Sequence, residues 1–169
     1  MKKRLFYITV LMLSIATVSN AQMKKGSFEI SGNSALQVSS SKVEGAESST
    51  TTVIFNPSVG YFVMDGLSVG LSANVLKSGG STEYAILPSA KYYFPFDMVF
   101  KPYVGLGLGY GGVSGDNDAS GFALAAGGGL TYLINSNVGV NLGLEYQRID
   151  YDGAVNNSFG GLVGFSLFF

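Results

Sequence analysis

The chain has 169 residues but contains no cysteine and no histidine. Without cysteine it cannot form a disulfide, a thiolate metal site or the lipid attachment of a lipoprotein. Enzymes need a positioned acid, base or nucleophile, and histidine and cysteine are among the side chains most used for these roles. The acidic residues fall mainly in predicted loops. We therefore expect no catalytic residue, no bound cofactor and no metal site.

Charged residues are also scarce, at 12% of the chain, which is about half their share in ordinary soluble proteins. Three of the 10 basic residues, Lys2, Lys3 and Arg4, stand at the very start, so 7 basic residues remain against 11 acidic ones. This mildly acidic balance gives no reason to expect a nucleic-acid partner. A surface so poor in charge suits lipid better than water.

Long apolar runs are missing everywhere except near the start. The three cations are followed by an apolar run at 5–18 and then by Ser19-Asn20-Ala21, which is the pattern of a signal peptide. We predict a leader at 1–21, cleaved between Ala21 and Gln22, and one mature domain at 22–169. No later run approaches the roughly 20 apolar residues that a membrane-spanning helix needs.

The chain is rich instead in residues that alternate between two environments, including 24 Gly, 12 Phe and 10 Tyr. At 158–169, one parity carries Phe159, Val163, Phe165, Leu167 and Phe169, whereas the other is mostly glycine and serine. A period of two indicates a strand with two different faces. About ten residues also suffice for a tilted strand to cross a bilayer.

The same alternation recurs seven more times along the chain. Asp65-Gly66 marks a tight hairpin turn, because the pair supplies the positive φ that such turns require. Pro88 lacks a ladder donor, which suggests a bulge at that position. An even number of strands joined by alternating long and short connections is typical of an up-and-down barrel in the outer membrane. The predicted strands are 26–38, 52–63, 67–77, 82–94, 101–112, 120–133, 138–149 and 158–169, and the predicted outer loops are 39–51, 78–81, 113–119 and 150–157.

A soluble lipocalin-like barrel would show the same alternation with its apolar face turned inward. Its exterior would then be built from the other parity, including Gly105, Gly107, Gly109 and Ala123. A soluble exterior needs charges and rarely consists of glycine and alanine. Those small residues suit the crowded interior of an eight-stranded barrel instead, because side chains nearly fill so narrow a barrel. The pattern favours an all-β transmembrane barrel.

Aromatic residues gather near the predicted strand ends, where rings are expected to meet the lipid headgroups. The expected outer girdle is Phe55, Tyr84, Tyr110, Phe122, Tyr146 and Phe159, and the expected inner girdle is Tyr61, Tyr92, Phe94, Tyr103, Tyr132 and Phe169.

Three charged residues, Glu29, Lys91 and Glu145, lie well inside predicted strands on the parity that faces the lumen. We expect Glu29 and Lys91 to form an ion pair toward the periplasmic end, with Glu145 nearer the outer end among Gln37, Asn33 and Asn141. The group could form a selectivity constriction or a gate. It could equally be a fixed polar plug that satisfies buried groups. The narrowness of eight strands favours the plug.

A segment at 116–121, D-N-D-A-S-G, matches the first half of a calcium-binding loop. The twelfth position should then hold a bidentate glutamate, but Gly127 stands there. We interpret the segment as a solvated loop. A divalent ion bound between lipopolysaccharide and Asp116, Asp118, Asp150 or Asp152 remains the alternative.

With its leader, its alternation and its terminal Phe169, the chain resembles the small eight-stranded outer-membrane barrels of Gram-negative bacteria, the porin-like or opacity-protein-like family. The resemblance implies that Phe165, Leu167 and Phe169 form a C-terminal signal read by the barrel insertion machinery, with help from periplasmic chaperones. It further implies a monomer in contact with outer-membrane lipid and lipopolysaccharide. Its function would be non-enzymatic, either structural or in surface interaction through the outer loops; the alternative is a narrow channel for ions or small polar solutes.

Overall fold

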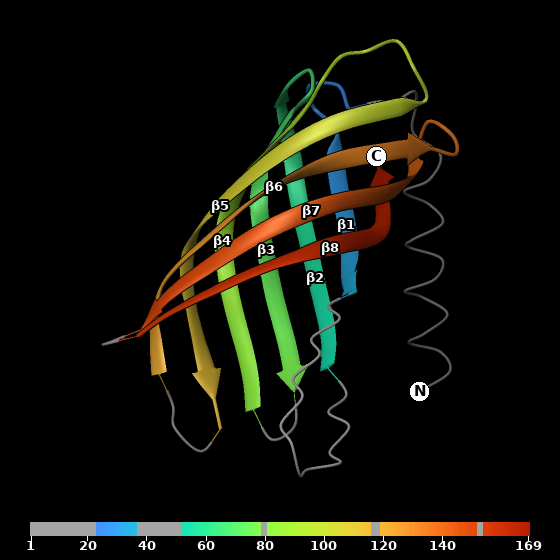
Figure 1. Cartoon of the computed structure of the whole chain (residues 1–169). Helices are drawn as coiled ribbons and strands as arrows, with labels where there is room; N and C mark the ends of the chain where they lie inside the picture. Colours follow the sequence, from blue (N-terminus) through green and yellow to red (C-terminus); the bar gives the residue numbers. More distant parts are fainter. Residues whose placement is uncertain (1–22, 37–51, 79–80, 116–118, 152–153) are drawn as a thin grey trace, which may run out of the picture.

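The computed structural model describes residues 23–36, 52–78, 81–115, 119–151 and 154–169. The predicted leader at 1–21, its cleavage site at Ala21 and Gln22, and the predicted lumen residue Gln37 lie outside these ranges. Within them, every strand pairs with its neighbours in the sequence, and the last strand pairs with the first to close a barrel (Figure 1). The strands are β1 (Phe28–Leu36), β2 (Thr52–Met64), β3 (Leu67–Ser78), β4 (Ser81–Tyr93), β5 (Phe100–Ser114), β6 (Ala119–Leu133), β7 (Val138–Tyr151) and β8 (Ala154–Phe168).

The barrel is closed by the two ends of the described chain. β1 and β8 run antiparallel in a continuous register from Glu29↔Phe168 to Leu36↔Gly161. At the inner end, the backbone groups of Phe28 and Phe169 bond to each other in both directions at 2.9 Å. Closure leaves neither edge of the sheet unpaired, so the backbone groups of both strands are satisfied inside a lipid environment. The predicted antiparallel up-and-down barrel of eight strands is confirmed.

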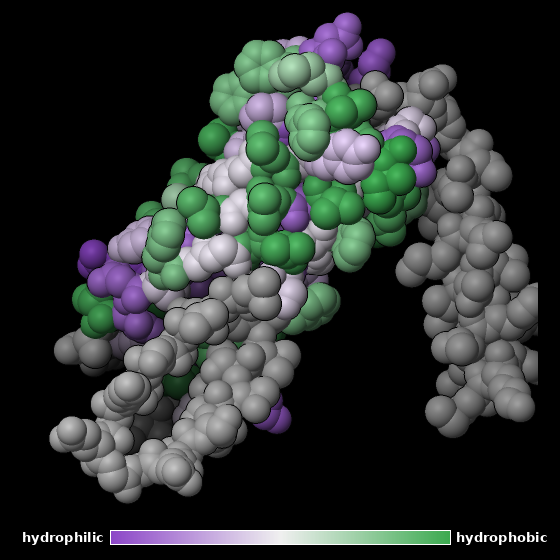
Figure 2. Space-filling view, turned by 45° about the vertical axis from the view of Figure 1, so that its right-hand side comes forward, coloured by the Kyte–Doolittle hydropathy of each residue, from purple (hydrophilic) through white to green (hydrophobic). Residues whose placement is uncertain are grey.

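The apolar parity faces outward, as the alternation predicted. The most exposed large apolar side chains are Phe159 at 64%, Leu142 at 62% and Phe165 at 61%. In the space-filling view, apolar residues cover much of the visible wall, and hydrophilic residues gather toward the two ends (Figure 2). A contiguous apolar exterior of this extent belongs against lipid rather than water. The described residues include no helix that is both long enough and apolar enough to span a bilayer.

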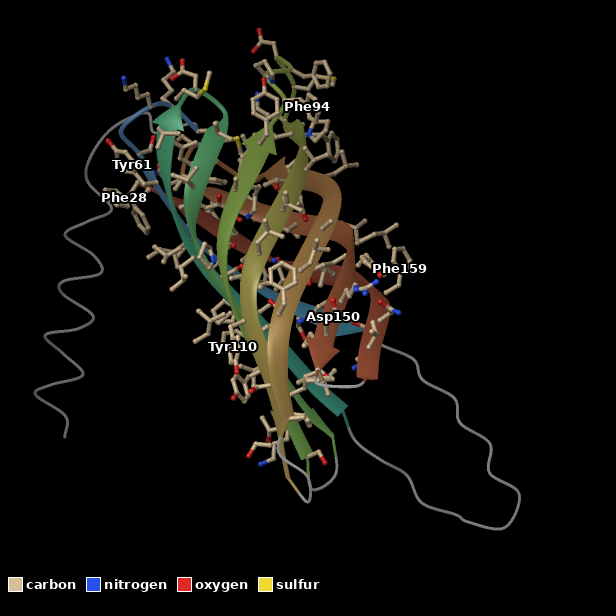
Figure 3. All side chains as sticks on the ribbon, turned by 90° about the vertical axis from the view of Figure 1, so that its left-hand side faces the viewer. Phe28, Tyr61, Phe94, Tyr110, Asp150 and Phe159 are labelled. Carbon is tan, nitrogen blue, oxygen red and sulfur yellow. The ribbon has the colours of Figure 1, made fainter. Side chains whose placement is uncertain are left out.

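Aromatic side chains lie on this wall at both levels. Near the inner end, the rings of Phe28 and Tyr61 pack with their centroids 5.0 Å apart (Figure 3). Toward the outer end, Tyr110 is 56% exposed and Phe122 is 52% exposed. Tyr103 was predicted in the inner girdle, and this was wrong: it is only 8% exposed and lies in the barrel interior. Tyr103 occupies an odd position of β5, as the inward-facing glycines of that strand do, so its ring points into the lumen.

The strand ends at the outer side differ from the sequence prediction. The loop predicted at 150–157 was wrong, because β7 continues to Tyr151 and β8 begins at Ala154, with pairing through Asp150↔Val155 and Tyr151↔Ala154. Likewise β5 reaches Ser114, inside the loop predicted at 113–119. Backbone pairing requires no apolar side chain, so a barrel wall continues past the apolar band while its residues become polar.

The expected alternation of long and short connections is therefore only partly correct. Fifteen residues separate β1 from β2, but only two separate β3 from β4 and two separate β7 from β8. The inner connection between β4 and β5, with six residues, is longer than either. The Asp65-Gly66 turn is confirmed, and Gly66 has a φ of +79°. No bulge forms at Pro88, which stays in register with Leu71; the register shift lies instead between Phe62 and Met64.

Candidate functional site: the barrel interior

The inner end of the lumen is filled by a cluster of large side chains that we call the aromatic cluster, formed by Met23, Phe62, Tyr93, Tyr103 and Phe168. Three of them, Phe62, Tyr93 and Phe168, are at most 1% exposed. Their ring centroids lie 6.0–6.3 Å apart, within the range of favourable aromatic packing. Because the rings come from three separate strands, β2, β4 and β8, the cluster extends across the barrel.

Sequence reasoning missed this cluster. A signal for it was present, since Phe62 alternates with the outward Tyr61 and Val63, and Phe168 alternates with the outward Leu167. A large aromatic residue on the small-residue parity near the inner strand end marks an interior ring.

Next to the aromatic cluster lies a buried carboxylate with three donors. Glu29, which is 2% exposed, accepts from the Lys91 ammonium at 2.7 Å, from the Tyr93 hydroxyl at 2.6 Å and from the Ser166 hydroxyl at 3.1 Å. All three bonds end on the same oxygen, Oε1. The Lys91 ammonium also lies 5.6 Å from the centroid of the Tyr103 ring and 5.7 Å from that of Tyr93. A charge removed from water in this way is stable only when paired and hydrogen-bonded.

A second buried polar residue extends this group. The Asn141 amide nitrogen donates to the Ser166 hydroxyl at 2.9 Å and to the Asn33 side-chain oxygen at 3.3 Å, while the Asn141 oxygen accepts from Thr131 at 2.8 Å. Hydrogen bonds therefore run from Asn141 through Ser166 to Glu29. Asn33 and Asn141 had been expected around Glu145, but the structure places them with Glu29 instead. They point into the lumen from strands β1 and β7, whose neighbour β8 supplies Ser166.

Glu145 has different partners on the opposite side of the lumen. Its carboxylate is approached by the Asn56 amide nitrogen at 3.5 Å and by the Asn74 amide nitrogen at 3.4 Å, both long for hydrogen bonds. On its own side of the barrel it lies between two glycines, Gly127 of β6 and Gly160 of β8. The carboxylate therefore crosses the lumen from β7 to reach β2 and β3.

Two cavities meet at Glu145. One, of about 80 Å³, extends from Lys91 and Tyr103 past Gly107 and Gly127 to Glu145. The other, of about 40 Å³, continues from Glu145 and Asn74 to Gln147 and Glu83. Spaces of this size hold a few water molecules.

Apolar residues fill the interior at the level above, with Ala85, Leu87, Ala123, Ala125 and Ile149 in one buried cluster. The lumen thus contains an apolar cluster at the inner end, a polar layer with small cavities, and an apolar layer farther out. The described residues contain no group of three or more acidic side chains arranged to hold a metal ion.

Comparison with known proteins identifies the fold. Residues 8–166 match the family described as the outer membrane protein beta-barrel domain. The chain belongs to this family. Among curated protein sequences, none matches it. An integral outer-membrane location follows from the family and from its structural neighbours.

Three solved outer-membrane barrels illustrate the similarity. The N-terminal barrel domain of OprF from Pseudomonas aeruginosa is 19% identical with a TM-score of 0.60, over 86% of this chain and 98% of that one. Neisserial surface protein A is 19% identical with a TM-score of 0.60, over 84% and 94%. The attachment invasion locus protein Ail of Yersinia pestis is 19% identical with a TM-score of 0.54, over 86% and 99%. At these identities the likeness shows the shared fold alone.

As a member of an outer-membrane barrel family, the chain lies in a lipid bilayer, which assigns its outward side chains to lipid and headgroups. Of the residues expected to form an insertion signal, Phe165 is 61% and Leu167 is 38% exposed on the outer wall, and Phe169 is partly buried beside β1. At the outer end, polar pairs replace the apolar band: Tyr146 donates to Asn157 at 2.8 Å, and Arg148 pairs with Asp150 at 2.9 Å.

Proposed function

We propose that this outer-membrane barrel is a non-enzymatic, non-conducting protein with a structural and surface-interaction role. The observation that supports it best is the filling of the inner end of the lumen by the aromatic cluster, backed by the bonded pair Glu29 and Lys91. Fully buried rings interlock at the density of a protein core and leave little room for ions. In this proposal the lumen network of Glu29, Lys91, Glu145, Asn33, Asn141 and Gln37 is a plug that holds the barrel together.

The outer side would then carry the interaction. The segments predicted as outer loops contain one basic residue, Lys42, against six acidic residues: Glu44, Glu47, Asp116, Asp118, Asp150 and Asp152. One barrel of the same fold, Ail, has been solved with the heparin analogue sucrose octasulfate. The acidic balance of the present segments opposes such a polyanion, since like charges repel across an interface. The partner we propose is a basic surface on another macromolecule.

The long segment between β1 and β2 is the most favourable place for this contact. A variant in which 39–51 is replaced by a short glycine-serine linker, displayed on whole cells, should lose retention on surfaces coated with a cationic polypeptide. A matched variant that exchanges Glu44 and Glu47 for glutamine tests charge without shortening the chain. Equal retention of all three versions, or stronger retention on immobilised heparin than on the cationic polypeptide, would contradict this proposal.

A narrow channel is the second candidate, and the two cavities joined at Glu145 favour it. Gly160, where an added methyl group would meet no heavy atom within 4 Å, leaves the wall open there, and movement of Lys91 away from Glu29 would act as a gate. Single-channel recording of the refolded protein in a planar bilayer separates the two candidates. We expect no discrete conductance from folded protein. Reproducible conductance steps whose size changes in Lys91→Ala or Glu145→Ala would contradict the plug and support the channel.

The remaining partners that we propose act during insertion of the barrel into the membrane. We propose that Phe165, Leu167 and Phe169 serve as the C-terminal signal for the insertion machinery, after periplasmic chaperones deliver a monomer whose leader, 1–21, has been removed at Ala21 and Gln22. Lipopolysaccharide would contact the outer rim, where Lys77 and Arg148 lie on the outward parity.

A further inference from the structure

The polar layer of the lumen carries an unbalanced charge at Glu145. Three charged side chains, Glu29, Lys91 and Glu145, face this layer from the strands that enclose it, together with the hydroxyls of Tyr93 and Tyr103. Lys91 forms an ion pair with Glu29, with its ammonium 2.7 Å from the carboxylate. Among the described residues, Glu145 takes part in no ion pair. One carboxylate is thus left in a confined space with no protein cation of its own.

The groups that face Glu145 compensate this charge only weakly. Its two amide donors, on Asn56 and Asn74, approach at 3.5 and 3.4 Å, where an N–H···O hydrogen bond is normally about 2.7–3.2 Å. A partly buried carboxylate held by two weak bonds retains much of the desolvation cost of its position. A positive charge placed beside it would remove that cost.

A second observation, independent of the acid, points to the same place. Asn56 is 8% exposed, and its side-chain oxygen Oδ1 is buried without a hydrogen-bond partner. A buried amide oxygen without a partner costs about 1–3 kcal/mol. This oxygen belongs to the same amide group whose nitrogen faces Glu145, and Asn56 lines both cavities that meet there. Rotation of this amide would turn the unpaired oxygen toward the Glu145 carboxylate, and a carboxylate with a neutral amide oxygen offers the oxygen ligands that a hard cation takes.

The space needed for a hydrated ion is present as well. A methyl group added at Gly160, the cross-strand neighbour of Glu145 on β8, would meet no heavy atom within 4 Å. The cavities of about 80 and 40 Å³ on either side have room for the waters that complete a coordination shell. A second carboxylate, Glu83, lines the outer cavity and lies on the route from the outer side.

We propose that the lumen binds one hard cation of the Ca²⁺ class at the Glu145 carboxylate and the Asn56 side-chain oxygen, with waters completing the shell. The Asn56 and Asn74 amides now turn their nitrogens toward Glu145, so binding requires the Asn56 amide to rotate and present its oxygen. Ca²⁺ accepts six to eight oxygen ligands in irregular geometry, whereas Mg²⁺ demands a near-ideal octahedron, so this mixed site suits Ca²⁺ better. With a single carboxylate, the dissociation constant should lie near the weak end of protein calcium sites, on the order of 10⁻³ M. The site does not depend on whether the barrel conducts, because it requires only access from the outer cavity.

Terbium luminescence tests the site on the refolded full mature chain. Tyr103 lines the same cavity as Glu145 and can sensitise a bound Tb³⁺ ion, and the chain contains no tryptophan to compete. We expect saturable emission at one ion per chain that added Ca²⁺ displaces. Glu145→Gln should weaken binding by about tenfold or more, equivalent to the loss of one charged ligand. Asp97→Asn, which removes the same charge at an exposed turn, should stay within about twofold of the unaltered chain.

A further variant guards against misfolding of Glu145→Gln. Asn56→Ala removes the unpaired oxygen while leaving the acid, and it should weaken binding by several-fold. Folding of each variant is checked by its heat-modifiable mobility on a gel. Absence of saturable binding to the unaltered folded chain would overturn the proposal. So would equal affinities in the unaltered chain, in Asn56→Ala and in folded Glu145→Gln, because the ion would then be held elsewhere. Neither result bears on the partner of the outer segments or on conductance.

Discussion

Removing the Lys91 ammonium should destabilise the barrel strongly, because it leaves the Glu29 carboxylate buried without its counterion. We consider Lys91→Met, which keeps the length of the side chain and removes the charge. Glu29 is 2% exposed, whereas the Lys91 side chain is 21% exposed, so one partner remains in contact with solvent. Breaking a fully buried ion pair costs about 3–5 kcal/mol.

The local contacts adjust this figure downward. Glu29 keeps two donors, the Tyr93 hydroxyl at 2.6 Å and the Ser166 hydroxyl at 3.1 Å. Bonds of this kind to a charged acceptor contribute about 1.5–3 kcal/mol each and persist in the variant. We expect Lys91→Met to lower the free energy of unfolding by about 3 kcal/mol, at the lower end of the range for buried pairs.

A double variant distinguishes an unpaired charge from lost packing. Glu29→Gln with Lys91→Met has no charge at the site, and the oxygen of the new amide can still accept from the Tyr93 hydroxyl. Its stability should return to within about 1 kcal/mol of the unaltered barrel. Unfolding by guanidinium in detergent micelles, followed by circular dichroism because the chain has no tryptophan, measures all members of the cycle. A loss below about 1 kcal/mol in Lys91→Met, or no recovery in the double variant, would refute the reasoning.

Three further outcomes are expected. Gly70→Ala should destabilise the barrel by about 1–3 kcal/mol in the same unfolding assay, because the new methyl group would lie 2.6 Å from the Gly60 Cα. Gly160→Ala, whose methyl group would meet no atom within 4 Å, should be nearly neutral. Equal effects of the two variants would contradict the packing. Leu106→Arg, at the middle of β5 on the lipid face, should lower the free energy of unfolding in lipid vesicles by about 2–4 kcal/mol. Val155→Arg, near the outer rim, should lower it by only about 0–1 kcal/mol. The reverse order would contradict the membrane placement. Phe169→Ala should slow the rate of barrel assembly in cells, measured by gel mobility after pulse labelling. The purified, refolded variant should unfold at nearly the same denaturant concentration as the unaltered barrel. If assembly rate and stability both fall, Phe169 has a purely structural role.

The barrel interior shows where sequence reasoning stopped. Parity placed Glu29, Lys91 and Glu145 on the lumen face because alternation is a local property of a strand. Which groups meet across the lumen depends on register and closure, which are not local. Asn141 and Asn33 therefore lie with Glu29, and Asn56 and Asn74, which the sequence did not single out, face Glu145. The inward ring of Tyr103 was misplaced for a simpler reason, because aromatic residues near strand ends were expected in the headgroup girdles, whereas Phe62 was given no role.

By itself, the sequence determined the strand count, the outward face and the membrane class. These follow from the period of two, the scarcity of charge and the length of each apolar segment, all of which can be read along one strand at a time. Only the tertiary structure decided which side chains fill the lumen, where the strands end and which charge remains unpaired. Those features arise when eight strands close on one another, because closure brings β7 opposite β2 and β3 and leaves Glu145 to meet whatever residues those strands present.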